Sequence, residues 1–286
     1  MNLIIASNAD SASINLRDRL LEMSSWRKCG EYDGNDMWEI NENQGDYCKK
    51  GTRLISIDNI HIKAERIDED YGKKENVKIN NIIFLSRHKA ASGKPSLTVH
   101  PIGNWGKAEY GGEEGKITPA SPKIMTSLLR EIKENQLEGF DVCFEATHHG
   151  PLLTTPTIFL EIGSTENEWE DKLPARALIK SLLEVKYISG KNVVGIGGGH
   201  YTPRFTEAAL THKVNFGHMV ANYGVPFLNN EVIKNAIEFS CAEGVYFHKK
   251  AMKKSTYREI KENLEKENIV VFEQADYSKI MQNSYN

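Results

Sequence analysis

Carboxylate and imidazole groups cluster in segment 145–151, which reads Glu-Ala-Thr-His-His-Gly-Pro. The segment follows residues 141–144, Asp-Val-Cys-Phe, an apolar run that predicts a short buried strand. In open α/β sheets, ligands bind beyond the carboxyl ends of strands. Because imidazole and carboxylate groups together suit a metal such as zinc, we expect a hydrolytic metal site in this segment.

Similar groups follow other predicted strands. His88 comes three residues after the apolar run 81–85, Glu161 ends the run 157–160, and His200 follows the strand-like run 193–196. Parallel strands end at one edge of a sheet, so these separate stretches could form a single site. The pool of candidate metal ligands is His88, Glu145, His148, His200 and Glu161, and the candidate catalytic groups are Glu145, His149 and His88.

Each of these residues also has a structural interpretation. His148 and His149 are adjacent and would point to opposite sides of an extended chain. We therefore expect only one of them to bind metal, unless the chain turns at Gly150-Pro151. Glu161 could instead cap a helix or form a salt bridge. Two further histidines, His61 and His212, are expected to be structural.

The sequence Gly197-Gly198-Gly199 lies between the predicted strand and His200, and Arg204 follows it. Consecutive glycines let backbone N–H groups approach an oxyanion, and an arginine near a helix start can bind phosphate. The alternative is a tight turn between a strand and a helix. The spacing lacks the GxGxxG and GxxxxGK[ST] patterns of nucleotide-binding loops, and no GxSxG motif of serine hydrolases occurs.

Positive charge is concentrated in segment 248–254, although the net charge of the chain is −3. Such a run favours contact with an RNA backbone, and the alternative is an ordinary solvated surface. The candidate tRNA-binding residues are Lys249, Lys250, Lys253, Lys254 and Arg258.

Helix-like and strand-like segments alternate from about residue 121 onward. This pattern predicts an α/β fold, with a mostly parallel sheet between layers of helices. Before residue 121 we expect two β-hairpins, with turns at 33–34 and 58–59, and a glycine-rich loop at 104–120. We place a boundary between an N-terminal part, 1–118, and a C-terminal part, 119–286, which pack around one site.

The 286-residue composition, with 40% hydrophobic and 26% charged residues, is typical of a soluble globular protein. The four cysteines form no CxxC pair, which argues against a disulfide framework and a cysteine-rich zinc site. Neither a signal peptide nor a membrane-spanning run is recognisable. We expect a cytoplasmic, monomeric protein without membrane association.

Four motifs, in this order, carry a resemblance to a known family. They are the stretch from Phe84-Leu85-Ser86-Arg87-His88-Lys89 to Asn104, the segment 145–151, Glu161-Ile162-Gly163-Ser164-Thr165 through Trp169, and Gly197-Gly198-Gly199-His200-Tyr201-Thr202-Pro203. The chain resembles the archaeal and plant type of D-aminoacyl-tRNA deacylase over nearly its whole length. The resemblance implies a zinc-dependent esterase that frees D-amino acids from mischarged tRNA, with a fold like that of phosphorylases and peptidyl-tRNA hydrolases.

The chemistry of the residues and the resemblance agree on ester hydrolysis. Zinc, as one ion or two, would lower the pKa of bound water and polarise the ester carbonyl. We also consider a metal-dependent peptidase or amidohydrolase with the same ligands, which would need no basic surface. A third possibility is a non-catalytic RNA-binding protein whose histidines are structural.

Overall fold

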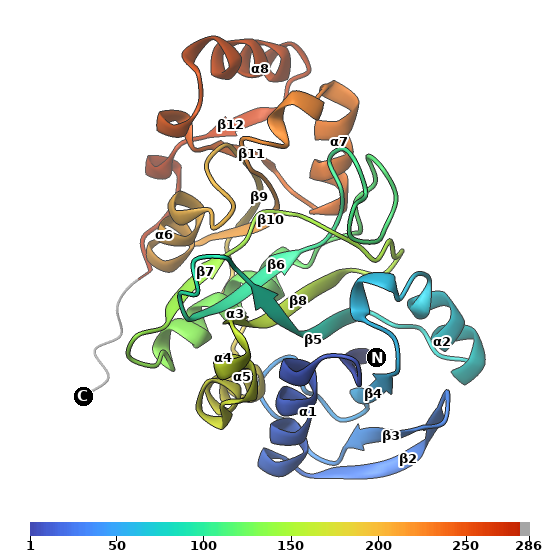
Figure 1. The fold of residues 1–286 in the computed structure, drawn as a ribbon. Coiled ribbons are helices and arrows are strands. Elements are labelled where there is room, and N and C mark those ends of the chain that lie inside the picture. Colours follow the sequence, from blue (N-terminus) through green and yellow to red (C-terminus); the bar gives the residue numbers. More distant parts are fainter. Residues whose placement is uncertain (281–286) are drawn as a thin grey trace.

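The structure is a computed structural model that describes residues 1–280. Its strands form two sheets, which lie one above the other in Figure 1. The larger sheet has the strand order β2-β3-β4-β1-β5-β8-β6-β7, and the smaller has the order β10-β9-β11-β12. Among the described residues, no helix is long and apolar enough to span a bilayer.

The larger sheet is mixed and mostly parallel. Strands β1 and β4, β1 and β5, β5 and β8, and β6 and β7 pair in parallel, whereas β6 and β8 pair antiparallel, as do the β2–β3 and β3–β4 pairs. Its strands are β1 (Asn2–Ser7), β2 (Trp26–Tyr32), β3 (Asn35–Ile40), β4 (Arg53–Ile57), β5 (Asn81–Lys89), β6 (Ser96–Pro101), β7 (Asp141–Phe144) and β8 (Thr157–Ser164).

The smaller sheet is parallel throughout. Its strands are β9 (Lys191–Ile196), β10 (Val214–Val220), β11 (Gly244–Phe247) and β12 (Val270–Phe272). The main helices are α1 (Ser11–Met23), α2 (Ile67–Glu75), α3 (Pro122–Glu134), α4 (Glu166–Glu170), α5 (Lys172–Glu184), α6 (Pro203–Thr211), α7 (Asn230–Phe239) and α8 (Lys254–Lys266). Short 3₁₀ helices are η1 (His61–Lys63), η2 (Val225–Phe227), η3 (Lys249–Ala251) and η4 (Gln274–Asp276).

Helix α3 connects the two sheets. It contacts β6 and β7 of the larger sheet and β9 and β10 of the smaller one. Leu128, on α3, belongs to a buried apolar cluster that also contains Leu97 of β6 and Phe216 of β10. Since this cluster is continuous across both sheets, the sheets share a core, and the loops between them are held at fixed positions.

The predicted class, α/β with a mostly parallel mixed sheet, is confirmed. The first predicted hairpin is also confirmed, because Asp33 and Gly34 both have positive φ, as a two-residue hairpin turn requires. The second hairpin is wrong: after the turn at 58–59, residues His61–Lys63 form η1 instead of a strand. Strand β10 and helix α2 were not predicted.

The division of strands into two sheets was not predicted either. The larger sheet takes strands from both sides of residue 118, since β7 and β8 follow that position and β1–β6 precede it. The smaller sheet lies entirely within 191–272. The boundary between 1–118 and 119–286 stays a prediction.

Candidate active site

Three side chains of the site lie on one face of the larger sheet. His88 is on β5, Glu161 on β8 and His100 on β6. In the register, Ser86 pairs with Glu161 and His88 with Gly163, while His100 pairs with Phe159. Because side chains alternate between faces, these pairings direct His88, Glu161 and His100 to the same side.

The remaining side chains come from two loops at the junction of the sheets. Residues 145–149 follow β7, and residues 197–202 follow β9. The amide of Ala146 donates to the carbonyl of His200 at 2.7 Å, and that of Thr147 donates to Met219 of β10 at 2.8 Å. The first loop is therefore hydrogen-bonded to the smaller sheet, and the site includes parts of both sheets.

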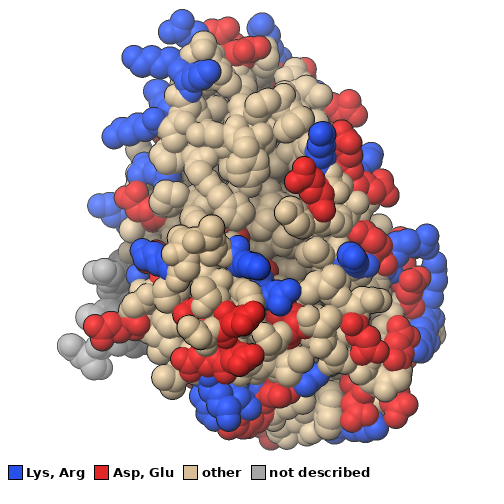
Figure 2. Space-filling view, in the orientation of Figure 1, with Lys and Arg blue, Asp and Glu red and all other residues tan. Residues whose placement is uncertain are grey.

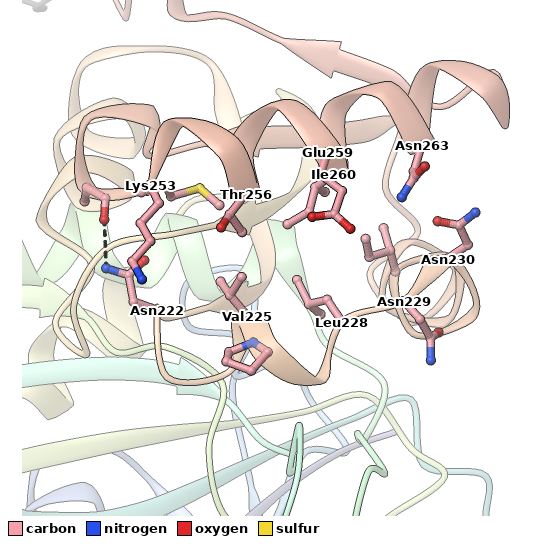
Figure 3. Close-up of a pocket in the computed structure, with 14 residues that line it drawn as sticks. Asn222, Val225, Leu228, Asn229, Asn230, Lys253, Thr256, Glu259, Ile260 and Asn263 are labelled. Atoms are coloured by element: carbon pink, nitrogen blue, oxygen red, sulfur yellow. Dashed lines mark hydrogen bonds between the residues drawn. The ribbon is translucent and has the colours of Figure 1, made fainter.

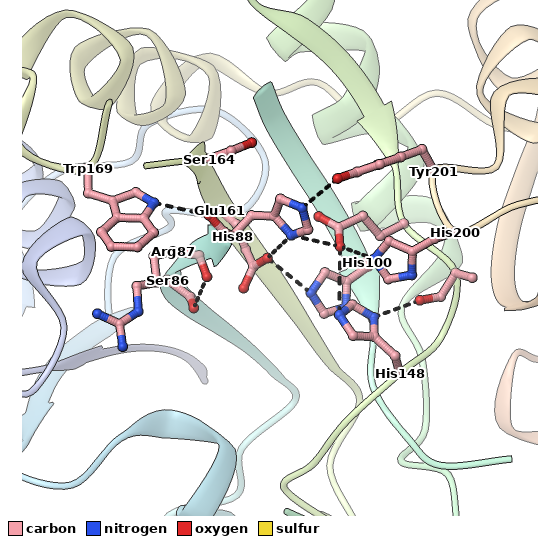
Figure 4. A network of polar contacts seen from close by, with 12 residues as sticks. Ser86, Arg87, His88, His100, His148, Glu161, Ser164, Trp169, His200 and Tyr201 are labelled. Carbon is pink, nitrogen blue, oxygen red and sulfur yellow. Dashed lines mark hydrogen bonds and ion pairs between the residues drawn. The ribbon is translucent and has the colours of Figure 1, made fainter. Parts of the chain in front are cut away.

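Figure 4 shows the cluster, in which the rings of His88, His148 and His200 lie close together. Glu145 lies between these rings and is completely buried. Its Oε2 lies 2.8 Å from Nε2 of His200 and 3.1 Å from Nδ1 of His88. Nε2 of His148 lies 3.7 Å from the same oxygen. One carboxylate oxygen thus faces three imidazole rings from three different segments.

The electrostatic balance keeps this carboxylate ionised. Burial by itself would raise the pKa of Glu145, but hydrogen bonding to His200 and His88 holds that pKa well below its usual range. Burial would lower the pKa of His88, yet the carboxylates of Glu145 and Glu161 override it and raise that pKa. The ionised carboxylate of Glu145 is therefore in contact with the imidazole of His88, which readily becomes protonated.

His148 also belongs to a second group, made with His100 and His149, whose ligand atoms lie within 4.8 Å of one another. In each ring Nδ1 faces a backbone carbonyl: Pro101 at 3.1 Å for His100, Ala146 at 2.8 Å for His148 and Gly150 at 2.6 Å for His149. A carbonyl only accepts hydrogen bonds, so in the neutral form of each ring Nδ1 carries the proton and Nε2 keeps its lone pair. This is the usual arrangement of histidines that bind metal.

The electrostatics also favour neutral rings for two members of this group, His148 and His149. Burial and the neighbouring rings of His100 and His149 hold the pKa of His148 well below its usual value. Burial and His100 lower the pKa of His149 to about 3. The pKa of His100 responds differently: burial would lower it, but Glu161 raises it. At neutral pH, His148 and His149 therefore present lone pairs instead of positive charge.

The paired histidines at 148 and 149 both face the cluster because the chain turns there. His149 has a φ of 46°, in the left-handed region. The rings of His148 and His149 have centroids 4.3 Å apart, and each ring also lies against His100. The turn expected near Gly150-Pro151 is therefore present.

The donor set fits a divalent metal. Nε2 of His100 and Oε1 of Glu145 are buried and have no hydrogen-bond partner among residues 1–280. Leaving such groups unpaired costs roughly 1–3 kcal/mol each, which a bound cation would offset. Two triads have suitable spacing, His100/His148/His149 and His88/Glu145/His200, and Glu161 joins His100 and Glu145 in a third.

Aromatic side chains hold the ligand groups in place. The hydroxyl of Tyr201 lies 2.9 Å from Nε2 of His88, and that of Tyr223 lies 3.2 Å from Nδ1 of His200. Trp169 donates its indole N–H to the carbonyl of His88 at 3.0 Å. Together with Oε2 of Glu145, the two tyrosine hydroxyls orient both ring nitrogens of His88 and of His200.

The glycines at 197–199 are required mainly for packing. A Cβ on Gly197 would meet the side chain of Met252 at 2.7 Å, and one on Gly198 would meet Nδ1 of His248 at 2.7 Å. The amides of Gly197 and Gly198 donate to Val220 and Asn222. Of the three predicted oxyanion donors, only Gly199 has an amide without an acceptor among the described residues.

Arg204 points away from the cluster. Its guanidinium pairs with Glu207 at 3.0 Å and also bonds Gln274. The predicted phosphate contact of Arg204 stays a prediction, and these partners give the side chain a structural role.

The predicted tRNA-binding residues lie together at the smaller sheet. They occupy η3, the N-cap of α8 and the first turns of α8, and their side chains are exposed. In Figure 2, lysine and arginine side chains gather along the left edge of the upper half of the molecule, while the hollow near the middle of this face is largely uncharged. Through Met252 and His248, this segment packs directly on the loop that carries His200.

His100 was not predicted as a site residue. It ends a run, 96–100, that was recognised as a strand, so the rule applied to the other strand ends would have found it. The expectation of a single edge with parallel strand ends is wrong. Glu161 lies within β8, which runs antiparallel to β6, and His200 comes from the smaller sheet.

The chain is similar to known proteins over most of its length. The model of the D-aminoacyl-tRNA deacylase family matches residues 75–272. The D-aminoacyl-tRNA deacylase of Picrophilus torridus is 36% identical, with 83% of this chain and 86% of the relative covered. That of Methanosarcina acetivorans is 34% identical, with 96% and 92% covered. A crystal structure described as a conserved protein of unknown function has a TM-score of 0.88 and 29% identity, covering 98% of this chain and 99% of its own.

Proposed function

The chain belongs to the D-aminoacyl-tRNA deacylase family, and on that premise we propose that its histidine and glutamate cluster hydrolyses the ester bond between a D-amino acid and the terminal ribose of tRNA. The observation that carries the proposal is the contact of a buried, ionised Glu145 with His88 and His200 beside the imidazoles of His100, His148 and His149. Carboxylate and imidazole pairs with opposed pKa shifts are typical of acid–base sites.

We assign zinc to the group His100, His148 and His149. Three imidazole ligands with a remaining open position are typical of catalytic zinc, and the free Nε2 of His100 supports this choice. Bound there, zinc would polarise the ester carbonyl and lower the pKa of water. Of the predicted metal ligands, this assignment retains His148. It adds His100 and His149, which were not among the predicted ligands. The triad His88/Glu145/His200 could hold a second ion, and Glu161 lies between the two groups.

Where only the group of His100, His148 and His149 holds zinc, the residues of the other triad move the protons. Glu145 takes a proton from the attacking water through Oε1, which has no partner among residues 1–280. Oxygen from water bonds to the carbonyl carbon as the bond to the ribose oxygen breaks. That oxygen needs a proton, and His88 supplies it through the Tyr201 hydroxyl beside its Nε2. Each proton transfer between well-placed groups typically contributes a factor of about 10² to 10⁴.

The basic residues at 249–254 and Arg258 are proposed to hold the acceptor stem of tRNA. They are exposed and adjoin the loop with His200, which supports a continuous path for the RNA. The monomeric state expected from the sequence stays a prediction. The substrate of the enzyme is made where tRNA is charged, which supports action in the cytoplasm.

The decisive experiment compares hydrolysis of D-Tyr-tRNA and L-Tyr-tRNA while the metal content is measured by mass spectrometry. We expect preferential D-Tyr release, loss of activity after chelation, and recovery with zinc. Activity unaffected by chelation in a metal-free protein would refute the metal assignment and leave the deacylase function intact. Binding of tRNA without turnover, in protein with its full metal content, would refute the hydrolase itself.

A further inference from the structure

A pocket of about 600 Å³ lies between helix α8 and the segment that contains η2 and the start of α7. It is separate from the histidine and glutamate cluster. In Figure 3, side chains of α8 line one wall and those of the 222–230 segment line the other. The α8 wall consists of Thr256, Glu259, Ile260 and Asn263, with Lys253 at the N-cap of the helix.

The lining combines apolar surface with hydrogen-bonding groups. Val225, Pro226, Leu228 and Ile260 supply apolar area, and Asn263, Thr256, Glu259 and Lys253 supply polar groups. Within residues 1–280, the side chains of Thr256, Glu259 and Asn263 make no hydrogen bond or ion pair with the rest of the chain. A flat ligand with apolar faces and a polar edge matches such walls, and nucleobases have these properties.

The pocket lies between the basic segment and the catalytic cluster. Asn222, on its rim, donates to the carbonyl of Ala251 at 2.9 Å and accepts from the amide of Gly198 at 3.2 Å. The next residue, Tyr223, contacts His200. Lys253 belongs both to the pocket wall and to the basic segment. An RNA strand that runs from the basic segment to the cluster therefore passes this pocket.

We infer that the pocket binds the base of the cytidine directly before the terminal adenosine of tRNA. The inference rests on the proposed function, because every tRNA ends in an unpaired cytidine-cytidine-adenosine strand whose terminal ribose carries the ester. Glu259 accepts a hydrogen bond from the cytosine amino group, a pairing that carboxylates make with this base. Asn263 or Lys253 donates to the carbonyl oxygen of the base, and the apolar side chains contact its faces.

The test measures the dissociation constant of unacylated tRNA, so it does not depend on catalysis. Thr256→Trp fills the pocket, and Ser255→Trp places the same side chain on the exposed neighbouring position of α8. We expect Thr256→Trp to weaken binding about tenfold and Ser255→Trp to leave it unchanged. With tRNA that lacks its last three nucleotides, both variants should bind as the parent protein does. Equal effects of the two variants would overturn the proposal, as would weakening that persists with truncated tRNA.

A second measurement identifies the base. Replacing the cytidine before the terminal adenosine by uridine exchanges an amino donor for a carbonyl acceptor, which Glu259 repels. The parent protein should bind the uridine tRNA about tenfold more weakly, and Glu259→Gln should bind both tRNAs equally. No preference in the parent protein would exclude this base. If the preference holds but D-aminoacyl-tRNA is not hydrolysed, the proposed function fails while the pocket assignment stands as an RNA-binding site.

Discussion

Nε2 of His200 lies 2.8 Å from Oε2 of Glu145, although the two residues follow strands of different sheets. The backbone reinforces this contact, since the amide of Ala146 donates to the carbonyl of His200. Because the carboxylate of Glu145 is hydrogen-bonded across the junction between the two sheets, the geometry of the site depends on how the sheets pack. Any change in that packing would alter the geometry of the ligands.

Glu145→Gln should remove the charge that joins His88, His148 and His200 while keeping the shape of the side chain. We expect kcat/KM for D-Tyr-tRNA to fall at least about 100-fold, because proton transfer through this group is lost. Quench-flow or steady-state release of D-tyrosine measures the effect. Glu166→Gln, on the exposed start of α4, is the matched control and should retain full activity. Activity within threefold of the parent in Glu145→Gln would contradict the proposed role.

His100→Asn should lower zinc content and activity, because His100 supplies one of three proposed ligands. His61→Asn is a matched control, since both rings pack on Phe159, with centroids 5.4 and 5.8 Å away. The control should keep its zinc, measured by mass spectrometry after dialysis. Full zinc occupancy in His100→Asn would show that the group of His100, His148 and His149 is not the metal site.

Tyr201→Phe should reduce kcat about tenfold with little change in KM, because the hydroxyl orients Nε2 of His88 and relays its proton. A purely structural tyrosine would change the thermal midpoint instead of kcat. Tyr223→Phe tests the equivalent contact with His200. Solvent isotope effects on kcat should decrease in Tyr201→Phe, and an unchanged isotope effect would argue against the relay.

Stability should fall in acid through His61. Burial lowers the pKa of this imidazole to about 4, from a usual value near 6.5. The unfolded chain therefore binds a proton at a higher pH than the folded chain does. The stabilisation that comes from keeping His61 neutral in the folded chain is fully present above about pH 6.5. As the pH falls towards 4, the free energy of unfolding decreases by up to roughly 3 kcal/mol.

Thermal unfolding of chelated protein between pH 4 and 7 checks this prediction, because chelation removes the effect of metal loss. The unfolding midpoint of His61→Asn should depend less on pH than that of the parent. Parallel pH curves for the two proteins would assign the acid sensitivity to other buried groups, such as His218.

Replacing Lys249, Lys250, Lys253 and Lys254 by alanine should raise KM for tRNA and leave kcat unchanged. Each lost phosphate contact should also reduce the slope of log KM against log salt by up to about 0.9. Alanine at four exposed lysines of α3, α5 and the following turn (Lys133, Lys172, Lys180 and Lys186) removes the same charge elsewhere. Equal changes in both quadruple variants would indicate a general charge effect instead of a binding surface.

The sequence by itself determined most of the elements and most of the site. Local patterns have local causes: apolar runs predicted β5, β6 and β9, and the Asp33-Gly34 turn predicted the first hairpin. The residues His88, Glu145, His148, His149, Glu161 and His200 were recognised because their chemistry is unusual at strand ends, and the structure brings all of them into one cluster.

Only the tertiary structure decided how these residues are arranged. The pattern of apolar residues along a strand does not specify which strands pair with it. The separation into two sheets and the antiparallel β6–β8 pair therefore could not be predicted. His100 became a site residue through that pairing, which places it on the face of Glu161. The backbone carbonyls that fix each Nδ1, and with it the free Nε2, are set by the folded loops, because hydrogen-bond geometry depends on three-dimensional contacts that residue types alone do not encode.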